Sequence, residues 1–331
     1  MHADACRARR AARRRCTVRA AHLAARVHGR RAELKPSRDD LLGAHVSTQG
    51  GVGTAPARAV AIGASAIQVF TKTPNQWREP VLDDADVAQF RSGLAAGGIR
   101  VAVSHDSYLI NLASPDDRLR ARSMRCFAGE LARCHALGIP WVVSHPGNYM
   151  DDRAAGVERN ARAYAACLTA APDDVGLLIE GTAGAGTALG STFEELGALR
   201  DALPAAVRPR VGFCLDTAHL HAAGYDVAGA IDEVWQQFDH MVGLPLLKCL
   251  HLNDSKGALG SRRDRHEWIG EGEIGPEPFR RIMRDARFAG VIKIIETPKG
   301  DDPVRHDRRM LRRLRAYARA NRRTAQTVRE G

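Results

Sequence analysis

Eight short apolar runs, separated by longer segments with helical periodicity, constrain the fold of this chain more than any other feature. The runs are rich in Val, Ile and Leu and lie at residues 41–47, 66–71, 100–105, 141–145, 175–180, 211–216, 246–252 and 291–297. The intervening segments predict helices, for example at residues 84–96, 117–137 and 154–171, with a last one after residue 303. Alternating strands and helices imply a parallel sheet, and eight units in about 260 residues match a (β/α)8 TIM barrel. We therefore predict one α/β domain, a TIM barrel, over residues 41–320.

The two ends of the chain are strongly basic, whereas its body is not. Residues 1–40 carry 12 Lys and Arg against 4 Asp and Glu, and residues 303–331 carry 10 against 2, so residues 41–302 contribute −5 to the net charge of +11. Basicity of the whole chain is therefore no evidence that the body binds nucleic acid. A negative body instead suits a carboxylate-rich metal site, because bound cations reverse the local charge.

The Arg- and Ala-rich residues 1–40 have little patterned apolar content, and we predict that they form a disordered basic extension outside the barrel. A basic arm that contacts nucleic acid, a transit-type presequence and translation from an upstream start are all compatible with this composition. Residues 321–331 are predicted to form a basic C-terminal tail.

The cysteines and the hydropathy indicate the compartment. The seven cysteines are scattered and show no CxxC pairing, which indicates reduced thiols, most of them buried as small hydrophobic side chains. No apolar run approaches the ~20 residues that a membrane span requires. We expect a cytoplasmic protein with no membrane partner.

The residues that close the predicted strands are the strongest indication of chemistry, because TIM-barrel enzymes place their active sites at the C-terminal ends of the strands. In chain order these residues are His45, the pair Thr71 and Lys72, His105, His145, Glu180, Asp216, His251 and Glu296. A single histidine at a strand end is more often a hydrogen-bonded structural residue than a ligand. Seven His, Asp and Glu side chains on one face would form a costly desolvated cluster unless they bound metal.

Two further pairs add to this set. His219 follows Asp216 by three residues, and Asp264 and His266 share one side of the polar, glycine-rich segment 251–275. Without His45 the set contains nine nitrogen and oxygen donors and no cysteine. This exceeds what one zinc or manganese ion uses and fits two or three ions that share bridging carboxylates. Clustered metal ions are a common means of in-line attack on phosphodiesters.

Eight motifs carry these residues. They are GAHVSTQGG (43–51), FTKTPNQW (70–77), HDSYLINLASP (105–115), SHPG (144–147), IEGTAGAGTALGSTFEEL (179–196), CLDTAHLHAAGYD (214–226), HLNDSKGALGSRRDRHEWIGEGEIG (251–275) and IIET (294–297). Taken together over residues 41–300, they resemble the endonuclease IV family of apurinic/apyrimidinic endonucleases, in family order. SHPG or IIET alone would carry little weight.

The resemblance implies an eight-stranded barrel nuclease for DNA repair with three Zn²⁺ ions, although Mn²⁺ would fit several of the same positions. The first ion would be held by His105, His145 and Glu180. Glu180 would bridge to a second ion, completed by Asp216, His251 and Glu296. The third, more exposed ion would be held by His219, Asp264 and His266.

The resemblance also implies the reaction. Hydrolysis of the phosphodiester 5′ to an abasic (AP) site would leave a 3′-hydroxyl and a 5′-deoxyribose phosphate, and the same chemistry would trim blocked 3′ ends. Attack would come from a metal-bridging hydroxide, with Glu180 as the catalytic residue that positions or deprotonates it. The expected partner is double-stranded DNA, bound by a monomer that acts on the nucleoid of a bacterial cytoplasm.

The family motifs indicate which residues contact DNA. Tyr108 and Leu109 match the segment that inserts into the duplex, although Leu109 could simply pack on the barrel rim. Asn75 and Gln76 match a loop that enters the minor groove. Phosphate contacts are expected from basic residues near the ligand loops, namely Lys72, Lys256, Arg262, Arg263 and Arg265.

Two positions depart from the family pattern. Asn75 stands where the family often has Arg, and Gly181 stands where a polar residue is frequent. The first departure concerns insertion into DNA, and the second concerns a hydrogen bond beside the metal site. Among the remaining histidines, we expect His45 to lie near the site, where it could contact substrate, and His221 to be structural.

Two other functions are compatible with parts of the sequence. Sugar isomerases and epimerases on related barrels also set Glu, Asp and His at strand ends, but they would not need His219, Asp264 and His266 or the arginines of the SRRDRH segment. A nucleic-acid-binding protein could use its Arg-rich termini and keep the barrel as a scaffold. The complete ligand set argues against a scaffold without catalysis.

Overall fold

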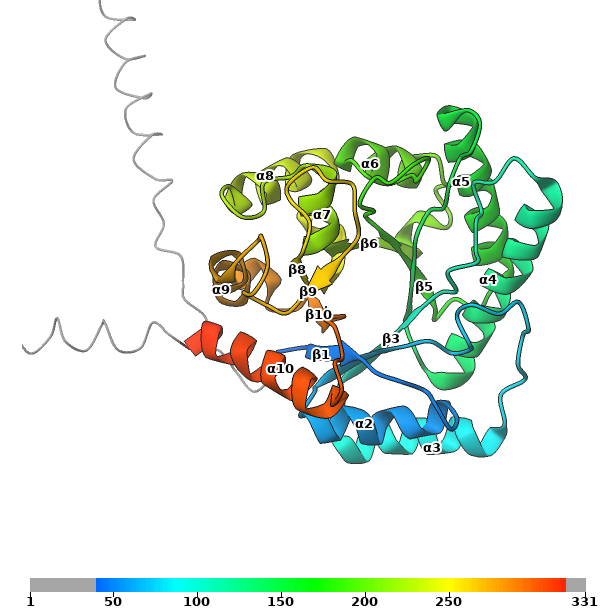
Figure 1. The fold of residues 1–331 in the computed structure, drawn as a ribbon. Coiled ribbons are helices and arrows are strands. Elements are labelled where there is room, and N and C mark those ends of the chain that lie inside the picture. The colour runs from blue at the N-terminus through cyan, green and yellow to red at the C-terminus, as the bar shows by residue number, and fades with distance from the viewer. Residues whose placement is uncertain (1–39, 320–331) are drawn as a thin grey trace, which may run out of the picture. The chain divides into compact units, whose positions relative to one another are not determined.

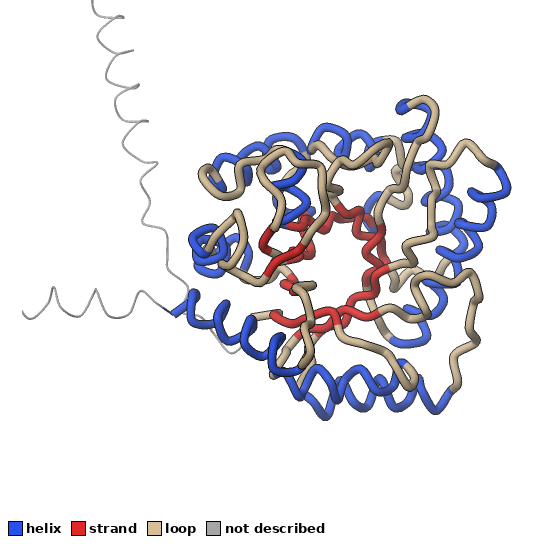
Figure 2. Tube along the Cα trace, viewed as in Figure 1, coloured by secondary structure: helices blue, strands red, loops and turns tan. Residues whose placement is uncertain are grey.

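In the computed structural model, which describes residues 40–319, eight strands form a closed parallel barrel with helices around it (Figures 1 and 2). The strands succeed one another around the barrel in the order β1-β10-β7-β6-β5-β4-β3-β2. Every neighbouring pair is parallel. The predicted TIM barrel is confirmed. The expectations for the two basic ends fall outside the described residues, apart from Asp40 and the described part of the last helix.

The eight predicted runs all become barrel strands. These are β1 (Leu42–His45), β2 (Ala66–Val69), β3 (Val101–His105), β4 (Trp141–Ser144), β5 (Gly176–Glu180), β6 (Val211–Asp216), β7 (Leu247–His251) and β10 (Ile292–Ile295). A two-stranded antiparallel ribbon, β8 (Asp254–Ser255) with β9 (His266–Glu267), forms within the long segment after β7. The predicted strands are therefore confirmed, and the ribbon was not predicted.

Nine α-helices lie in residues 40–319. They are α2 (Ala55–Ile62), α3 (Asp84–Gly97), α4 (Asp117–Leu137), α5 (Arg153–Ala170), α6 (Phe193–Asp201), α7 (Thr217–Ala223), α8 (Ile231–Met241), α9 (Pro276–Arg284) and α10 (Pro303–Arg319). Short 3₁₀ turns occur at Val52–Thr54, Arg208–Arg210, Leu244–Leu246 and Ala286–Phe288. In this part of the chain no helix is both long and apolar enough to cross a membrane.

The barrel interior consists of an apolar layer beneath the residues that end the strands. One buried cluster contains Ala66, Val103, Val143, Leu178, Cys214, Cys249, Ile292 and Ile294. Successive side chains of a strand point to opposite faces, so a residue and the one two positions later share a face. Most members of the cluster precede a strand-end residue by two positions, as Val103 precedes His105 and Leu178 precedes Glu180. The alternation of the strands therefore turns the polar strand ends inward.

Capping residues fix where the helices start behind these strand ends. Asp83, Asp116 and Asp152 accept hydrogen bonds from the first backbone N–H groups of α3, α4 and α5. Asp216 does the same for α7, because its Oδ1 accepts from Ala218 N at 2.6 Å. The other oxygen of Asp216 stays available to the strand-end cluster, so one carboxylate both starts a helix and faces the site.

Candidate metal centre

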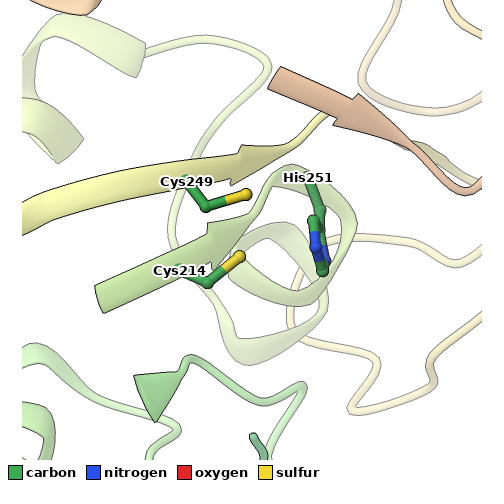
Figure 3. A group of neighbouring side chains, drawn as sticks. All are labelled: Cys214, Cys249 and His251. Carbon is green, nitrogen blue, oxygen red and sulfur yellow. The ribbon is translucent and has the colours of Figure 1, made fainter. Parts of the chain in front are cut away.

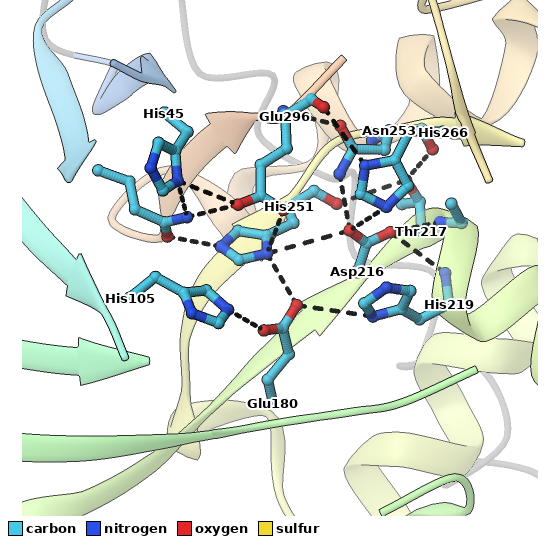
Figure 4. Close-up of polar contacts among 12 residues, drawn as sticks. His45, His105, Glu180, Asp216, Thr217, His219, His251, Asn253, His266 and Glu296 are labelled. Carbon is cyan, nitrogen blue, oxygen red and sulfur yellow. Dashed lines mark hydrogen bonds and ion pairs between the residues drawn. The ribbon is translucent and has the colours of Figure 1, made fainter. Parts of the chain in front are cut away.

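Glu180 lies at the centre of the strand-end cluster and contacts histidines on both of its oxygens (Figure 4). Its Oε2 is 3.0 Å from His105 Nε2 and 3.4 Å from His145 Nε2. Its Oε1 is 2.8 Å from His251 Nδ1 and 3.6 Å from His219 Nδ1. The side chain is fully buried. A carboxylate whose two oxygens face separate groups of imidazoles has the geometry of a bridging ligand.

A second group of donors surrounds His251 Nδ1. Glu296 Oε2 lies 3.2 Å from this nitrogen and Asp216 Oδ2 lies 3.9 Å from it. The other ring nitrogen, Nε2, contacts Gln68 Oε1 at 2.7 Å. Gln68 Nε2 donates in turn to Glu296 Oε1 at 2.5 Å. Gln68 therefore orients both a histidine and a carboxylate of this group.

A third group is built around Asp264. Its Oδ1 lies 3.0 Å from His266 Nε2 and its Oδ2 lies 3.2 Å from His219 Nε2. His266 Nε2 also lies 3.5 Å from Asp216 Oδ2, which links this group to the second one. Asp264 is the most open member, with a side chain 55% exposed. The prediction that Asp264 and His266 share one side of an extended segment is confirmed by this contact.

Three of the histidines present Nε2 to the cluster because their Nδ1 is held by a backbone carbonyl. His105 Nδ1 contacts Asp106 O at 3.0 Å, and His266 Nδ1 contacts Glu296 O at 3.3 Å. His219 Nδ1 contacts Gly181 O at 2.9 Å. Such outer contacts fix ring orientation and tautomer in metal sites. The backbone of Gly181 thus makes a hydrogen bond beside the site, although the residue has no side chain to make one.

The donor atoms converge closely enough to share ions. Within residues 40–319 three sets of His, Asp and Glu ligand atoms lie within 4.8 Å of one another: His105, His145 and Glu180; Glu180, Asp216, His251 and Glu296; and Asp216, His219 and His266. Asp216 thus belongs to two sets, as Glu180 does. Within this donor cluster two buried ring nitrogens, His145 Nδ1 and His266 Nε2, have no partner in hydrogen-bonding geometry. A bound cation would satisfy the His266 nitrogen, so the residues fit metal ions.

The electrostatics of the cluster favour cations. Burial by itself would raise the pKa of Glu180, but the nearby histidines hold it well below its usual range. Burial disfavours protonation of His105, yet the hydrogen bond and charge of Glu180 raise its pKa to about 9. Burial lowers the pKa of His145 to about 4. The carboxylates therefore draw positive charge into the cluster, as a centre for divalent ions requires.

The long segment after β7 is tied down over the cluster by backbone contacts with α7. Gly260 N donates to His221 O at 3.0 Å, and Arg262 N donates to Ala222 O at 2.9 Å. Arg262 adopts a left-handed φ of 53°, which is uncommon for a residue other than glycine. These contacts and the β8–β9 pairing carry Asp264 and His266 to the site. His221 is buried, and its backbone carbonyl accepts the bond from Gly260.

The residues expected to contact DNA lie around the mouth of the barrel and differ in their exposure to solvent. Asn75, Gln76 and Arg265 are exposed, Leu109 is half-buried, and Tyr108 is 68% exposed with its ring edge against Phe70. Three further basic residues, Lys256, Arg262 and Arg263, are also exposed. Lys72 differs, because its ammonium is buried and donates to Glu79 Oε1 at 2.8 Å and Gln76 O at 2.6 Å. Lys72 therefore holds the loop of residues 72–79 together from its buried side. The expected phosphate contact of Lys72 is wrong, because its ammonium does not face solvent.

The same loop rests on a buried ion network from α4. Arg133 Nε donates to Thr71 Oγ1 at 2.7 Å, and the two guanidinium ends reach Glu79 Oε2 at 2.6 Å and Glu130 Oε2 at 2.7 Å. Gly129 leaves room for this contact, because a Cβ there would lie 2.5 Å from Glu79 Oε2. The strand end that carries Thr71, the one without a ligand-type residue, thus anchors the loop of Asn75 and Gln76.

A cavity of about 230 Å³ opens beside the first and third groups. Its walls come from the loops after β3, β4 and β5, and the lining includes His105, Tyr108, His145, Asn148, Thr182 and Asp264. The cavity therefore lies where a substrate group could reach the buried donors.

Sequence reasoning missed several residues that hold the site. Gln68 and Asn253 make hydrogen bonds to Glu296 and Asp216, and the Arg133 network supports the loop. A signal existed for two of them: Gln68 is a polar residue inside an apolar strand, and Asn253 follows His251 by two positions. His45 Nδ1 lies 3.4 Å from Glu296 Oε1 and 2.9 Å from Gln68 Nε2, at the edge of the second group.

Comparison with known proteins gives consistent matches over the barrel. Residues 56–314 match the family model of the xylose isomerase-like TIM barrel. A protein of Trichlorobacter lovleyi named probable endonuclease 4 is 48% identical over 267 residues, which cover 80% of this chain and 94% of that protein. A protein of the same name from Geobacter sulfurreducens is 46% identical over 268 residues, covering 80% and 90%.

Solved structures agree with these matches. The crystal structure of endonuclease IV from Thermus thermophilus superposes with a TM-score of 0.74 at 37% identity and covers 83% of this chain and 98% of that one. A D-psicose 3-epimerase superposes with a TM-score of 0.58 at 19% identity, covering 88% and 99%, a likeness that concerns the fold alone. From the family model and the close relatives together, the chain belongs to the endonuclease IV family of nucleases on the xylose isomerase-like TIM barrel.

Proposed function

We propose that this protein is a DNA repair endonuclease that hydrolyses the phosphodiester 5′ to abasic sites, leaving a 3′-hydroxyl and a 5′-deoxyribose phosphate. The observation that carries the proposal is the position of Glu180, which joins two donor groups at the mouth of a barrel of this family. Removal of blocked 3′ ends would use the same phosphodiester chemistry. The protein would act as a monomer on double-stranded DNA in the bacterial cytoplasm, at the nucleoid.

We infer three zinc ions from the donor set. The first would bind His105, His145 and Glu180, the second Glu180, Asp216, His251 and Glu296, and the third His219, Asp264 and His266. Mainly nitrogen and carboxylate donors without thiolates suit zinc, and manganese would fit the more carboxylate-rich second group. Asp216 Oδ2 lies 3.5 Å from His266 Nε2, so the third group of donors lies beside the second. When bound, the ions would lower the pKa of a water molecule and neutralise charge on the phosphate.

The chain's own residues supply positioning and proton handling. Glu180 stays ionised, since its pKa is held low, and can therefore accept a hydrogen bond from the attacking water and orient it toward phosphorus. Asp264 is exposed at the rim, where a phosphate would enter, and its neighbours Arg263 and Arg265 can attract that phosphate. The buried outer contacts hold the donors in place before substrate arrives, which avoids reorganisation during the reaction.

Recognition would depend on shape more than on base sequence. An abasic nucleotide costs little to rotate out of the base stack, and a narrow cavity excludes a nucleotide that still carries its base. Tyr108, Leu109, Asn75 and Gln76 would enter the duplex beside the lesion. Asn75 is exposed but shorter than the Arg that the family often carries there. Insertion of this loop into the duplex would therefore depend more on Gln76.

The test is incision of a duplex with one abasic-site analogue, compared with the same duplex without a lesion. We expect a cut 5′ to the analogue, a product end that a DNA polymerase extends, and loss of incision after prolonged chelation. Glu180→Gln, which keeps the size of the side chain but removes its charge, should abolish the cut. An intact abasic duplex in the presence of zinc-loaded protein, together with turnover of a ketose sugar, would instead favour the epimerase alternative.

A further inference from the structure

A pair of cysteine thiols lies directly beneath the carboxylate cluster, inside the barrel. Cys214 on β6 and Cys249 on β7 are register partners on adjacent strands and are both fully buried. Figure 3 shows both sulfur atoms directed toward the ring of His251. The two sulfurs and one ring nitrogen of His251 all lie within 4.8 Å of one another. No other group of donors within residues 40–319 combines two thiols.

We propose that Cys214, Cys249 and His251 form a separate site for a thiophilic metal ion, of the class of Cd²⁺ or Hg²⁺. Thiolate donors prefer soft ions, whereas the carboxylate groups above them suit harder ones. For zinc, bonds of about 2.3 Å to sulfur place two thiolates of one tetrahedral ion about 3.8 Å apart, and the longer bonds of larger thiophilic ions place them further apart. The observed cluster therefore needs only a small adjustment of side chains to close around an ion.

The charge balance of the site favours a divalent ion. Both thiols must lose a proton to bind, so uptake of one divalent ion releases two protons and leaves a neutral assembly of two thiolates, one imidazole and the ion. A neutral assembly suits these surroundings, because the rest of the cluster consists of Ala, Val, Leu and Ile side chains. Two thiolates without an ion would leave uncompensated buried charge.

The position of His251 gives this site a functional consequence, which rests on the function proposed above. His251 Nδ1 is 2.8 Å from Glu180, and Nε2 is 2.7 Å from Gln68. An ion held by the thiols could bind Nδ1, which would break the contact of this nitrogen with Glu180. It could instead bind Nε2, which would break the hydrogen bond with Gln68 and rotate the ring. In both cases the second zinc loses a correctly placed ligand. A thiophilic ion in this site therefore inhibits incision by competing for His251.

The test uses the full-length, zinc-loaded protein under a phosphine reductant, titrated with Cd²⁺ alone. Wild-type protein should develop the ultraviolet thiolate-to-cadmium charge-transfer band with one Cd²⁺, release about two protons per ion, and lose incision as the band grows. Cys249→Ala should lose most of the band and remain active at the Cd²⁺ concentration that half-saturates the wild-type band. Cys134→Ala removes an equally buried thiol outside the barrel interior and should behave as the wild type does.

A measurement on the wild type alone guards against a variant that fails to fold. The ¹¹³Cd NMR spectrum should contain a signal at the chemical shift of an ion with two sulfur ligands. A band of equal size in Cys249→Ala, or the absence of a two-sulfur signal, would overturn the proposed site. Equal Cd²⁺ inhibition of wild type and Cys249→Ala would overturn the competition for His251. Failure of the nuclease proposal gives a different pattern, because the band would form in a protein that never cuts abasic DNA.

Discussion

The carboxylate of Asp264 lies 3.0 Å from Nε2 of His266, two residues further along the same extended segment. The same chain contains a second Asp–His contact, between Asp174 and His135 at 2.8 Å, on the outer surface of the barrel. The two carboxylates are similarly exposed, at 55% and 59%, but the two pairs differ in surroundings. Only the first faces a further histidine and the buried carboxylates of the cluster. This contrast separates a metal-site role from an ordinary surface ion pair.

Asp264→Asn is expected to remove the third zinc and leave the fold unchanged. Because the side chain is more than half exposed, the variant should keep the fold, while loss of one bound ion lowers the free energy of unfolding of the zinc-loaded protein. Bound zinc should fall by one ion per chain, and incision should slow by at least about tenfold, since even outer contacts of metal sites are worth this much. Asp174→Asn is the matched control and should alter neither zinc content nor rate.

Gln68→Met is expected to weaken the second zinc position without touching a ligand directly. Methionine keeps the length of the side chain but removes the hydrogen bonds to His251 and Glu296. Loss of such orienting contacts typically costs about 10- to 100-fold in metal affinity or activity. Competition with a chelating dye measures the affinity. Gln237→Met, on the exposed face of α8, should leave it unchanged, and equal affinities for the two variants would contradict the orienting role.

Arg133→Met is expected to destabilise the protein strongly, because it leaves the buried carboxylate of Glu130 without its cation, whereas Glu79 keeps its bond to Lys72. Arg133 and Glu130 are both buried, and breaking a buried ion pair from one side typically costs about 3–5 kcal/mol. Urea unfolding gives the change. Arg162→Met breaks an exposed pair with Glu158 and should cost less than about 1 kcal/mol. A small effect at Arg133 would mean that the network does not hold the loop.

Tyr108→Ala is expected to weaken substrate binding more than the chemical step. The ring is mostly exposed at the mouth of the barrel and packs against Phe70 in a T-shaped contact. Stacking of an aromatic side chain on a base is worth about 1–3 kcal/mol, so KM for abasic duplex should rise roughly tenfold while kcat changes little. Met241→Ala, at the exposed end of α8 that leads back to the start of β7, is the control. A fall in kcat alone would contradict a binding role for Tyr108.

The sequence predicts the barrel and the convergence of ligands because both depend on short-range patterns. Strand-end positions share one face by the two-residue period, so His105, Glu180 and His251 converge once the barrel closes. The supporting contacts do not follow from any local pattern. Gln68 and His251 are 183 residues apart in the chain, and the inward turn of Lys72 depends on Glu79 and on the space above Gly129. Such contacts join residues that are distant in the chain, so they can be identified only from the packed structure.

Zinc titration of chelated protein, with incision of abasic duplex followed at each step, shows directly whether incision requires three ions. Activity should stay low through the first equivalents and reach its full rate only as about three zinc ions bind per chain. Glu180→Gln should bind fewer ions and show no activity at any zinc concentration. Full incision with one zinc per chain, or incision without metal, would contradict the trinuclear centre.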